Sequence, residues 1–279
     1  MKNKRVVLIL GNRGMLGSML EKYFNLQSDK YNIHVLNRSS FNATKLYLYE
    51  DIDFSKYDYV INCMGITKGI IEGRSNKKVT EEEVIQVNSI LPWWLARKTK
   101  KIIHISTDCI FSGNKEVDKM YNCYDIPDAN DLYGLSKRLG EPKNCMVIRS
   151  SFVGPSIKGE GVCLFDWLVQ NKGQIIDGYD NHYWNGITTL QLAKYLYNII
   201  DNNRYKVGIY HLSSPNDYTK YELCKCISDI FDLKLIVNKN IKTLTINRCL
   251  VDTEYSIMKA IPIKQQLIEL KEFMEKYYK

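Results

Sequence analysis

The chain has 279 residues, of which 45% are hydrophobic and 25% are charged. This composition is typical of a globular protein with one large domain or two closely packed ones, and it excludes a disordered or fibrous chain. The formal net charge of +8 comes from scattered basic residues, so it predicts an anionic small molecule or mere solubility rather than a nucleic-acid partner.

Targeting segments and metal sites are not expected. The apolar run at residues 6–10 is too short for a signal peptide, and no run reaches the length of a membrane span. The eight cysteines lie in apolar stretches without paired metal-ligand spacing. We therefore expect a cytoplasmic protein with reduced thiols, no bound metal and no membrane partner.

Strands and helices alternate through the first half of the chain. Buried parallel strands are predicted at residues 6–10, 33–36, 59–64, 101–105 and 146–148. Helices are predicted at 18–24, at 84–91 with an end near Pro92-Trp93-Trp94, and around Tyr133. This alternation predicts an α/β fold, a Rossmann-like doubly wound parallel sheet.

The texture changes after about Gly154. Helices are predicted at 162–169, 190–200, 221–231 and from 264 onward, with a short strand at 208–212. We expect residues 1–154 to form a dinucleotide-binding Rossmann domain, to which about 184–214 return. Residues 155–279 are expected to form a smaller substrate-binding lobe.

A glycine-rich turn follows the first predicted strand and opens the first helix. Glycines at 11, 14 and 17 allow a tight turn and let the backbone approach a pyrophosphate at the positive helix end. The spacing departs from G-x-G-x-x-G. The predicted cofactor contacts here are Gly11, Asn12, Arg13, Gly14, Met15, Leu16 and Gly17.

The end of the second predicted strand indicates which dinucleotide binds. It reads Asn37-Arg38-Ser39, without the carboxylate that usually binds the ribose 2′-hydroxyl of NAD. Arg13 and Arg38 instead suit a 2′-phosphate, although Arg38 is also explained by solvent exposure. The sequence therefore predicts NADP(H) as the cofactor.

Tyr133 and Lys137 are four residues apart, so they share one face of a predicted helix. Lowering the pKa of a tyrosine from about 10 to about 7 requires roughly 4 kcal/mol. One positive charge at about 4 Å supplies roughly 4 kcal/mol at an effective dielectric of about 20. The pair is therefore sufficient to make a proton donor, whereas His104, within a strand, is expected to be a satisfied core residue.

Several motifs together resemble the extended short-chain dehydrogenases/reductases. They are the glycine turn, Asn62-Cys63-Met64-Gly65, the block from Ser106 to Gly113, and Asp131 to Glu141 with its Tyr-x3-Lys. The last two, with residues 208–223, are similar to the dTDP-4-dehydrorhamnose reductase family and its UDP-sugar relatives. Residues 184–189 resemble reductases of 4-keto-6-deoxy UDP-N-acetylhexosamines.

The resemblance implies a role for each matched residue. Tyr133 would give a proton to a sugar carbonyl oxygen, Thr107 would hydrogen-bond the same oxygen, and Lys137 would lower the tyrosine pKa and hold the nicotinamide ribose. Ser106 would share the task of Thr107 or bond to backbone, and Asn88 would fix backbone or water near the lysine or be a structural amide. The remaining predicted cofactor contacts are Cys63, Met64 and Gly65, besides Asn88, Ser106, Tyr133 and Lys137.

Other residues are predicted to contact the substrate. Thr67 and Lys68 follow a strand at the edge of the sheet where ligands bind. Lys68 is also explained by solvent exposure, and Trp184 by a place in the core. The predicted substrate contacts are Thr67, Lys68, Thr107, Asp108, Trp184 and Arg248.

The resemblance implies NADPH-dependent reduction of the 4-keto group of a UDP- or dTDP-linked 4-keto-6-deoxy sugar, with a further 3-epimerisation left open. The product would be a deoxyhexose donor for glycan assembly. Cys109 stands where nucleotide-sugar dehydratases carry a glutamate, which argues against dehydration. A 4-epimerase and a non-catalytic NADP-binding regulatory subunit are the alternatives, and relatives suggest a homodimer.

Overall fold

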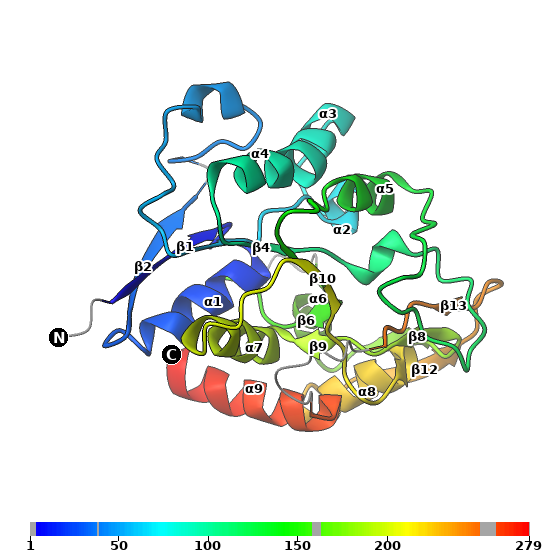
Figure 1. The fold of residues 1–279 in the computed structure, drawn as a ribbon. Coiled ribbons are helices and arrows are strands. Elements are labelled where there is room, and N and C mark those ends of the chain that lie inside the picture. Colours follow the sequence, from blue (N-terminus) through cyan, green and yellow to red (C-terminus); the bar gives the residue numbers. More distant parts are fainter. Residues whose placement is uncertain (1–3, 38, 158–162, 252–260, 279) are drawn as a thin grey trace.

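The structure, a computed structural model, describes residues 4–37, 39–157, 163–251 and 261–278. Its centre is a parallel sheet (Figure 1). The strands are β1 (Arg5–Leu10), β2 (Tyr31–Leu36), β3 (Tyr59–Asn62), β4 (Ile102–Ile105), β5 (Met146–Arg149) and β10 (Gly208–His211). Their order is β10-β5-β4-β3-β1-β2, and each neighbouring pair is parallel. The predicted doubly wound sheet is confirmed.

The strand order places a ligand crevice beside β1. The chain passes from β1 to β2 on one side and then to β3 on the other side. Helices α1 (Met15–Asn25) and α7 (Thr189–Asp201) pack on the face that carries Val7 and Ile9. Helices α3 (Glu81–Ile85) and α4 (Leu91–Lys98) pack on the face that carries Leu8 and Leu10. Ligands of such sheets bind beyond the carboxyl ends of the strands at this reversal.

The predicted end of a helix near Pro92-Trp93-Trp94 is wrong. A π-helical turn, η2 (Gln86–Ile90), joins α3 to α4, which continues to Lys98. Pro92 lies in the first turn of α4, where a missing N–H is tolerated, and the wider π turn precedes it. Trp94 is buried on the sheet, whereas Trp93 is exposed and bonds to the Leu139 carbonyl.

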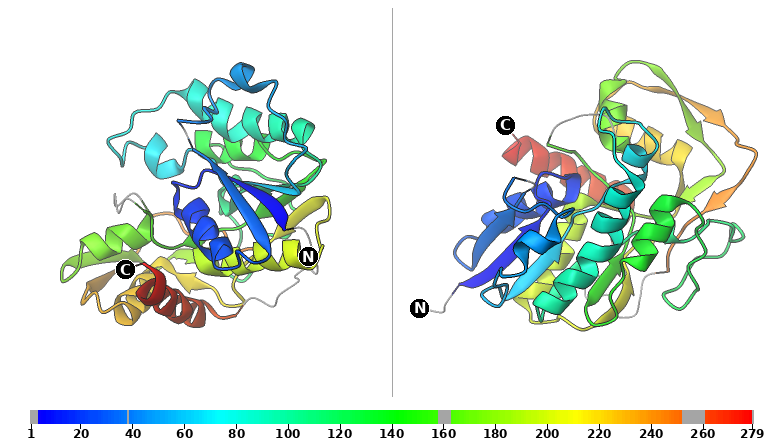
Figure 2. Two further views of the ribbon diagram at one scale, coloured as in Figure 1. Left: turned by 90° about the vertical axis from the view of Figure 1, so that its left-hand side faces the viewer. Right: turned by 90° about the horizontal axis from the view of Figure 1, so that it is seen from above.

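The second half of the chain builds its own core and also returns to the sheet. Its core contains α6 (Leu164–Gln170), α8 (Lys220–Ile230) and α9 (Ile263–Tyr277). Small sheets frame it, with the strands β6 (Phe152–Val153), β7 (Ile175–Tyr179), β8 (His182–Trp184), β9 (Ile187–Thr188), β11 (Tyr218–Thr219), β12 (Ile236–Asn240) and β13 (Ile246–Asn247). Strand β10 pairs with β5, and α9 lies beside α1 (Figure 2).

The short elements around the crevice are η1 (Leu46–Tyr49), α2 (Lys68–Ile71), η3 (Asp108–Ile110) and α5 (Leu132–Leu139). Among the described residues, no helix is long and apolar enough to cross a membrane. The same residues contain no group of three His, Cys, Asp or Glu side chains arranged to hold a metal ion.

Candidate active site

The glycine turn is a close-packed backbone cradle at the carboxyl end of β1. Gly11 has a φ of +85°, a conformation that glycine adopts without strain. A Cβ on Gly17 would lie 2.2 Å from the Gly11 carbonyl oxygen, so only glycine fits there. Gly14 is the N-cap of α1, and because glycine has no side chain, no side-chain cap covers the first N–H groups of that helix. The cradle therefore presents an anion-binding helix end at the crevice.

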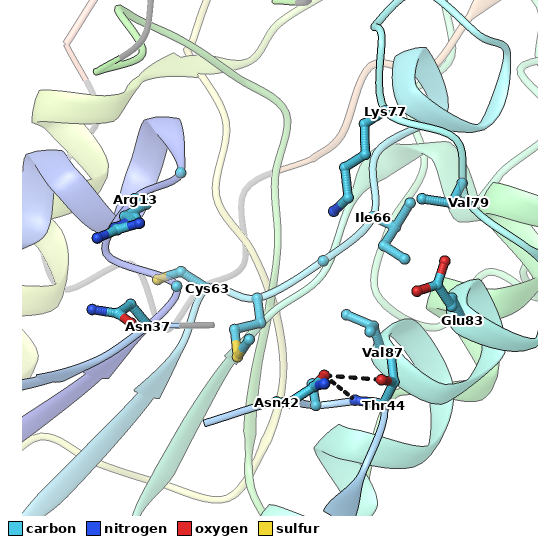
Figure 3. A pocket seen from close by; sticks show the side chains of 15 residues that line it. Arg13, Asn37, Asn42, Thr44, Cys63, Ile66, Lys77, Val79, Glu83 and Val87 are labelled. Atoms are coloured by element: carbon cyan, nitrogen blue, oxygen red, sulfur yellow. Dashed lines mark hydrogen bonds between the residues drawn. The ribbon is translucent and has the colours of Figure 1, made fainter. Parts of the chain in front are cut away.

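A cavity of about 210 Å³ opens beside this cradle. Seven of the predicted cofactor contacts line it, namely Gly11, Arg13, Gly14, Asn37, Cys63, Met64 and Gly65. In Figure 3, Arg13 and Asn37 lie on one side, with Ile66, Val79 and Glu83 on the other and Lys77 extending between them. The other residues that line the cavity were not predicted from the sequence; they are Asn42, Ala43, Thr44, Ile66, Lys77, Val79, Glu83 and Val87.

Other predicted cofactor residues lie outside the walls of this cavity. Leu16 is buried in the core, and the Asn12 amide nitrogen donates to Glu21 at 3.0 Å, which leaves the buried Asn12 Oδ1 without a partner among the described residues. The Ser39 N–H donates to Asn37 Oδ1 at 2.9 Å and fixes that turn. Arg38 lies outside the described residues.

The remaining predicted contacts of the glycine turn, Met15 and Gly17, belong to the first turn of α1. Gly17 is buried and is packed on the Gly11 carbonyl, so its role is to bring helix and strand together. Met15 is half-buried at the start of the helix.

Helix α5 carries Tyr133 and Lys137 into the crevice. Its N-cap is Asp131, whose carboxylate accepts the Gly134 N–H at 3.0 Å. A Cβ on Gly134 would lie 2.4 Å from the Cys109 carbonyl oxygen, so glycine lets the helix press against η3. Thr107, the N-cap of η3, is thereby held close to Tyr133.

The pKa values of Tyr133 and Lys137 differ from the expectation. Burial raises the pKa of the Tyr133 phenol well above its ordinary value, Cys109 adds to the rise, and Thr107 acts in the opposite direction. Burial lowers the pKa of Lys137 to about 8. The Lys137 ammonium donates to the Ile105 carbonyl at 2.8 Å. The pKa of Tyr133 is thus raised rather than lowered in this structure, and burial is the largest cause.

Asn88 lies in the π turn and is fully buried. Its side-chain oxygen accepts the Ile66 N–H at 2.8 Å, and its nitrogen donates to the Ile66 carbonyl at 2.9 Å and to Ser136 Oγ at 3.1 Å. These bonds join the loop after β3 to α5. A Cβ on Gly65 would lie 3.9 Å from Lys137 Nζ, so this loop brings the cavity wall next to the lysine.

Ser106 has a side-chain partner away from the crevice. Its hydroxyl donates to Glu141 Oε1 at 2.6 Å, and Ser106 is 2% exposed. The hydroxyl of neighbouring Thr107 instead donates to Asp108 Oδ1 at 3.1 Å. Of the two hydroxyls, that of Thr107 is the one that interacts with the Tyr133 phenol and lowers its pKa.

The predicted substrate residues have mixed environments. Thr67 is exposed, and Lys68 forms an ion pair with Asp131 at 3.0 Å. Arg248 donates to the carbonyls of Phe111 and Ser112 at 2.9 and 3.1 Å, which places it beside residues 107–113, the loop that the resemblance marks as the catalytic loop.

Trp184 is a core residue whose indole N–H donates to Ser151 Oγ at 2.7 Å. The ammonium of Lys220 lies 4.8 Å from the centre of its ring. Burial lowers the pKa of Lys220, and Asp108 acts in the opposite direction, so Lys220 approaches the catalytic loop from the second half of the chain. Sequence reasoning missed Lys220, because no local motif marks a lysine at the start of a helix.

The doubly wound sheet, the glycine cradle and the Tyr133/Lys137 helix define the class as an extended short-chain dehydrogenase/reductase. A family model described as the RmlD substrate binding domain matches residues 4–278, and the chain belongs to that family.

Relatives with known names share this fold. The dTDP-4-dehydrorhamnose reductase of Aggregatibacter actinomycetemcomitans is 26% identical over 236 residues, which cover 80% of this chain and 78% of that protein. The dTDP-4-dehydrorhamnose reductase of Bacillus anthracis, solved in complex with NADP, is 18% identical with a TM-score of 0.78 and covers 98% of this chain and 100% of its own. The UDP-glucose 4-epimerase of Thermotoga maritima, solved with UDP-glucose, is 16% identical with a TM-score of 0.74, over 98% and 100% of the two chains. The shared fold therefore does not by itself separate a reductase from an epimerase.

Proposed function

We propose that the chain is an NADPH-dependent reductase of the 4-keto group of a 4-keto-6-deoxy nucleotide sugar. The observation that carries this proposal is the meeting of three parts: the glycine cradle with its cavity, the buried Lys137, and Tyr133 beside Thr107. The dTDP-4-dehydrorhamnose reductase names of its relatives support the reaction class.

The residues of the cavity fit a phosphorylated dinucleotide. The glycine cradle would hold the diphosphate at the start of α1, and Arg13 and Asn37 on the cavity wall suit the 2′-phosphate of NADP. Bound NADPH supplies the hydride for C4 of the sugar. Residues 1–154, with β10 added to their sheet, would thus bind the cofactor, and the lobe built from 155–279 would bind the nucleotide sugar.

Each residue of the trio has a distinct task in the proposed reaction. The Tyr133 phenol is protonated at neutral pH, which is the form that can donate a proton to the carbonyl oxygen, and burial, by raising its pKa, makes it a weaker acid. Thr107 would donate a hydrogen bond to the same oxygen. Lys137, charged below a pH of about 8, would stabilise the phenolate that forms and bind the nicotinamide ribose.

The sugar nucleotide would lie between the catalytic loop and the lobe. Arg248 and Lys220 are two cations beside this loop: against the effect of burial, Arg248 lowers the pKa of Cys109, and Asp108 raises the pKa of Lys220. They suit the two negative charges of a diphosphate. The test varies the nucleotide, UDP or dTDP, and the group at sugar C2, hydroxyl or N-acetyl.

The test is NADPH consumption by the purified protein with UDP- and dTDP-linked 4-keto-6-deoxyhexoses, with and without the 2-N-acetyl group. Turnover of one of them is expected, and analysis of the product at C3 reports any epimerisation. Tyr133→Phe should lower kcat by about 10²–10⁴-fold, because it removes the proton donor, while the Kd of NADPH stays unchanged. Turnover retained by Tyr133→Phe would refute the role of the phenol.

A further inference from the structure

A buried ion pair lies one helical turn beyond Lys137. Glu141 follows α5 by two residues, and its carboxylate pairs with Arg149 of β5 at 2.7 Å. A second bond joins Arg149 Nε to Glu141 Oε1 at 3.0 Å. The two side chains are only 6% and 4% exposed. A buried pair of this kind is weak as a source of stability, because desolvation offsets the attraction, so its position invites another explanation.

The pair is bonded to the ends of three neighbouring strands. Glu141 Oε1 also accepts the hydroxyl of Ser106, which directly follows β4 and precedes Thr107. Arg149 lies 3.5 Å from His211 Nε2 at the end of β10, and its guanidinium stacks over the Phe111 ring at 5.6 Å. His211 Nδ1 in turn lies 3.1 Å from the Tyr121 carbonyl. The pair therefore fixes the strand end that carries Thr107.

Glu141 is also the group that does most to raise the pKa of the buried Lys137. From β4, Lys137 meets the Ile105 carbonyl and His104, whose pKa burial lowers far enough to keep the ring neutral. From the end of β3 it meets Cys63, whose pKa burial raises so that the thiol stays protonated. Among the described groups that act on the Lys137 pKa, Glu141 is thus the carboxylate, and it is held in an ion pair with Arg149.

His104 is a neighbour of Lys137 that does not compensate the burial of its positive charge. It is fully buried, with Nδ1 3.1 Å from the Asn62 amide nitrogen, and its Nε2 has no partner among the described residues. His104 is the core residue that the sequence predicts, but among the described residues only its Nδ1 has a hydrogen-bond partner. A neutral histidine and a neutral thiol offer Lys137 little compensation for its burial.

We propose that Glu141 is a positioning residue, which holds the Ser106–Thr107 strand end against the Tyr133 helix and supplies a buried carboxylate one helical turn after the Lys137 ammonium. The inference rests on the proposed function for its kinetic readout.

The test is the pH dependence of kcat/KM for Glu141→Gln in the full-length protein, with the keto sugar that the wild type reduces. Lys137 loses its proton as the pH rises through its pKa of about 8, and Glu141 raises that pKa. Removing the carboxylate should therefore move the alkaline limb of the profile to lower pH by about one unit. Glu141→Asp, which restores the charge, should return the limb toward its wild-type position.

Ser106→Ala is the matched control. It removes the hydrogen bond to Glu141 without changing any charge, so kcat should fall while the alkaline limb keeps its pH. Glu141→Gln leaves Arg149 buried and unpaired, so the variant that also carries Arg149→Gln provides a second route to the same measurement. An alkaline limb that stays in place both in Glu141→Gln and in the Glu141→Gln variant that also carries Arg149→Gln, with or without a lower rate, would overturn the proposal.

A parallel measurement separates this inference from the proposed function. The affinity for NADPH is followed against pH in the wild type and in Glu141→Gln. A wild type that binds NADPH and reduces no sugar of the panel refutes the proposed function. If the affinity for NADPH begins to fall at a lower pH in Glu141→Gln than in the wild type, the role of Glu141 is still supported. If the affinity depends on pH in the same way in both proteins, that role is contradicted.

Discussion

The two sides of the crevice are built in opposite ways. The proposed cofactor side is made largely of backbone, from one short stretch in which Gly11, Gly14 and Gly17 let strand and helix approach each other. The proposed substrate side is made of side chains such as Lys220 and Arg248, which come from distant parts of the chain. The backbone side tolerates almost no added atom, whereas the side-chain side can change its chemistry one residue at a time.

The largest expected effect falls on the backbone side. Gly17→Ala places a Cβ 2.2 Å from the Gly11 carbonyl oxygen, so the turn must move. We expect the free energy of unfolding to fall by about 1–3 kcal/mol and NADPH binding to weaken by about tenfold or more. Denaturant unfolding and NADPH titration measure the two effects.

Gly14→Ala is the control for this change. Its Cβ would lie 3.3 Å from the same oxygen, a tight but adjustable contact. Its losses should be clearly smaller than those of Gly17→Ala. Equal losses for both variants would show that the close packing is not what restricts the turn.

A change of intermediate size is expected on the substrate side. Lys220→Met keeps an apolar chain over Trp184 and removes the charge. If the ammonium binds a diphosphate oxygen, the KM for the sugar nucleotide should rise by about tenfold, the worth of one charge-assisted hydrogen bond. Lys220→Arg should restore most of the affinity, and the Kd of NADPH should not change. An unchanged KM in Lys220→Met would remove Lys220 from the substrate site.

The smallest effect is expected at Lys68. Its ammonium already pairs with Asp131, the N-cap of α5, and both side chains are about one third exposed. Lys68→Met should lower the free energy of unfolding by less than about 1 kcal/mol. Asp131→Ala, which removes the cap itself, should cost about 1 kcal/mol. A KM that rises strongly in Lys68→Met would return this residue to the substrate contacts.

The sequence predicted the parts of the molecule that depend on local patterns. Short apolar runs and the glycine spacing indicated the parallel sheet and the cradle at the end of β1, because neighbouring residues determine both. The pairing of Tyr133 with Lys137 followed from helical periodicity. The continuation of α4 through Pro92 did not, because a π turn before a proline leaves no simple periodic signal.

Features that depend on distant contacts were not accessible. The cavity wall at residues 42–44 comes from a loop with no motif, and Lys77 and Glu83 come from beyond β3. The hydrogen bond from Ser106 to Glu141 joins residues that are 35 positions apart in the sequence. The rise of the Tyr133 pKa likewise reflects burial by the whole fold, which a pairwise estimate from sequence omits.

The place of β10 in the sheet has a consequence for synthesis on the ribosome. Strand β5 ends at Arg149, but its neighbour Gly208–His211 emerges about sixty residues later in the chain. Until then one edge of a buried, apolar sheet has unpaired N–H and C=O groups, and the sheet face that α7 covers is bare. Such an edge invites pairing with other chains. A polypeptide that stopped at residue 154 would retain Thr107, Tyr133 and Lys137 and yet be prone to aggregate.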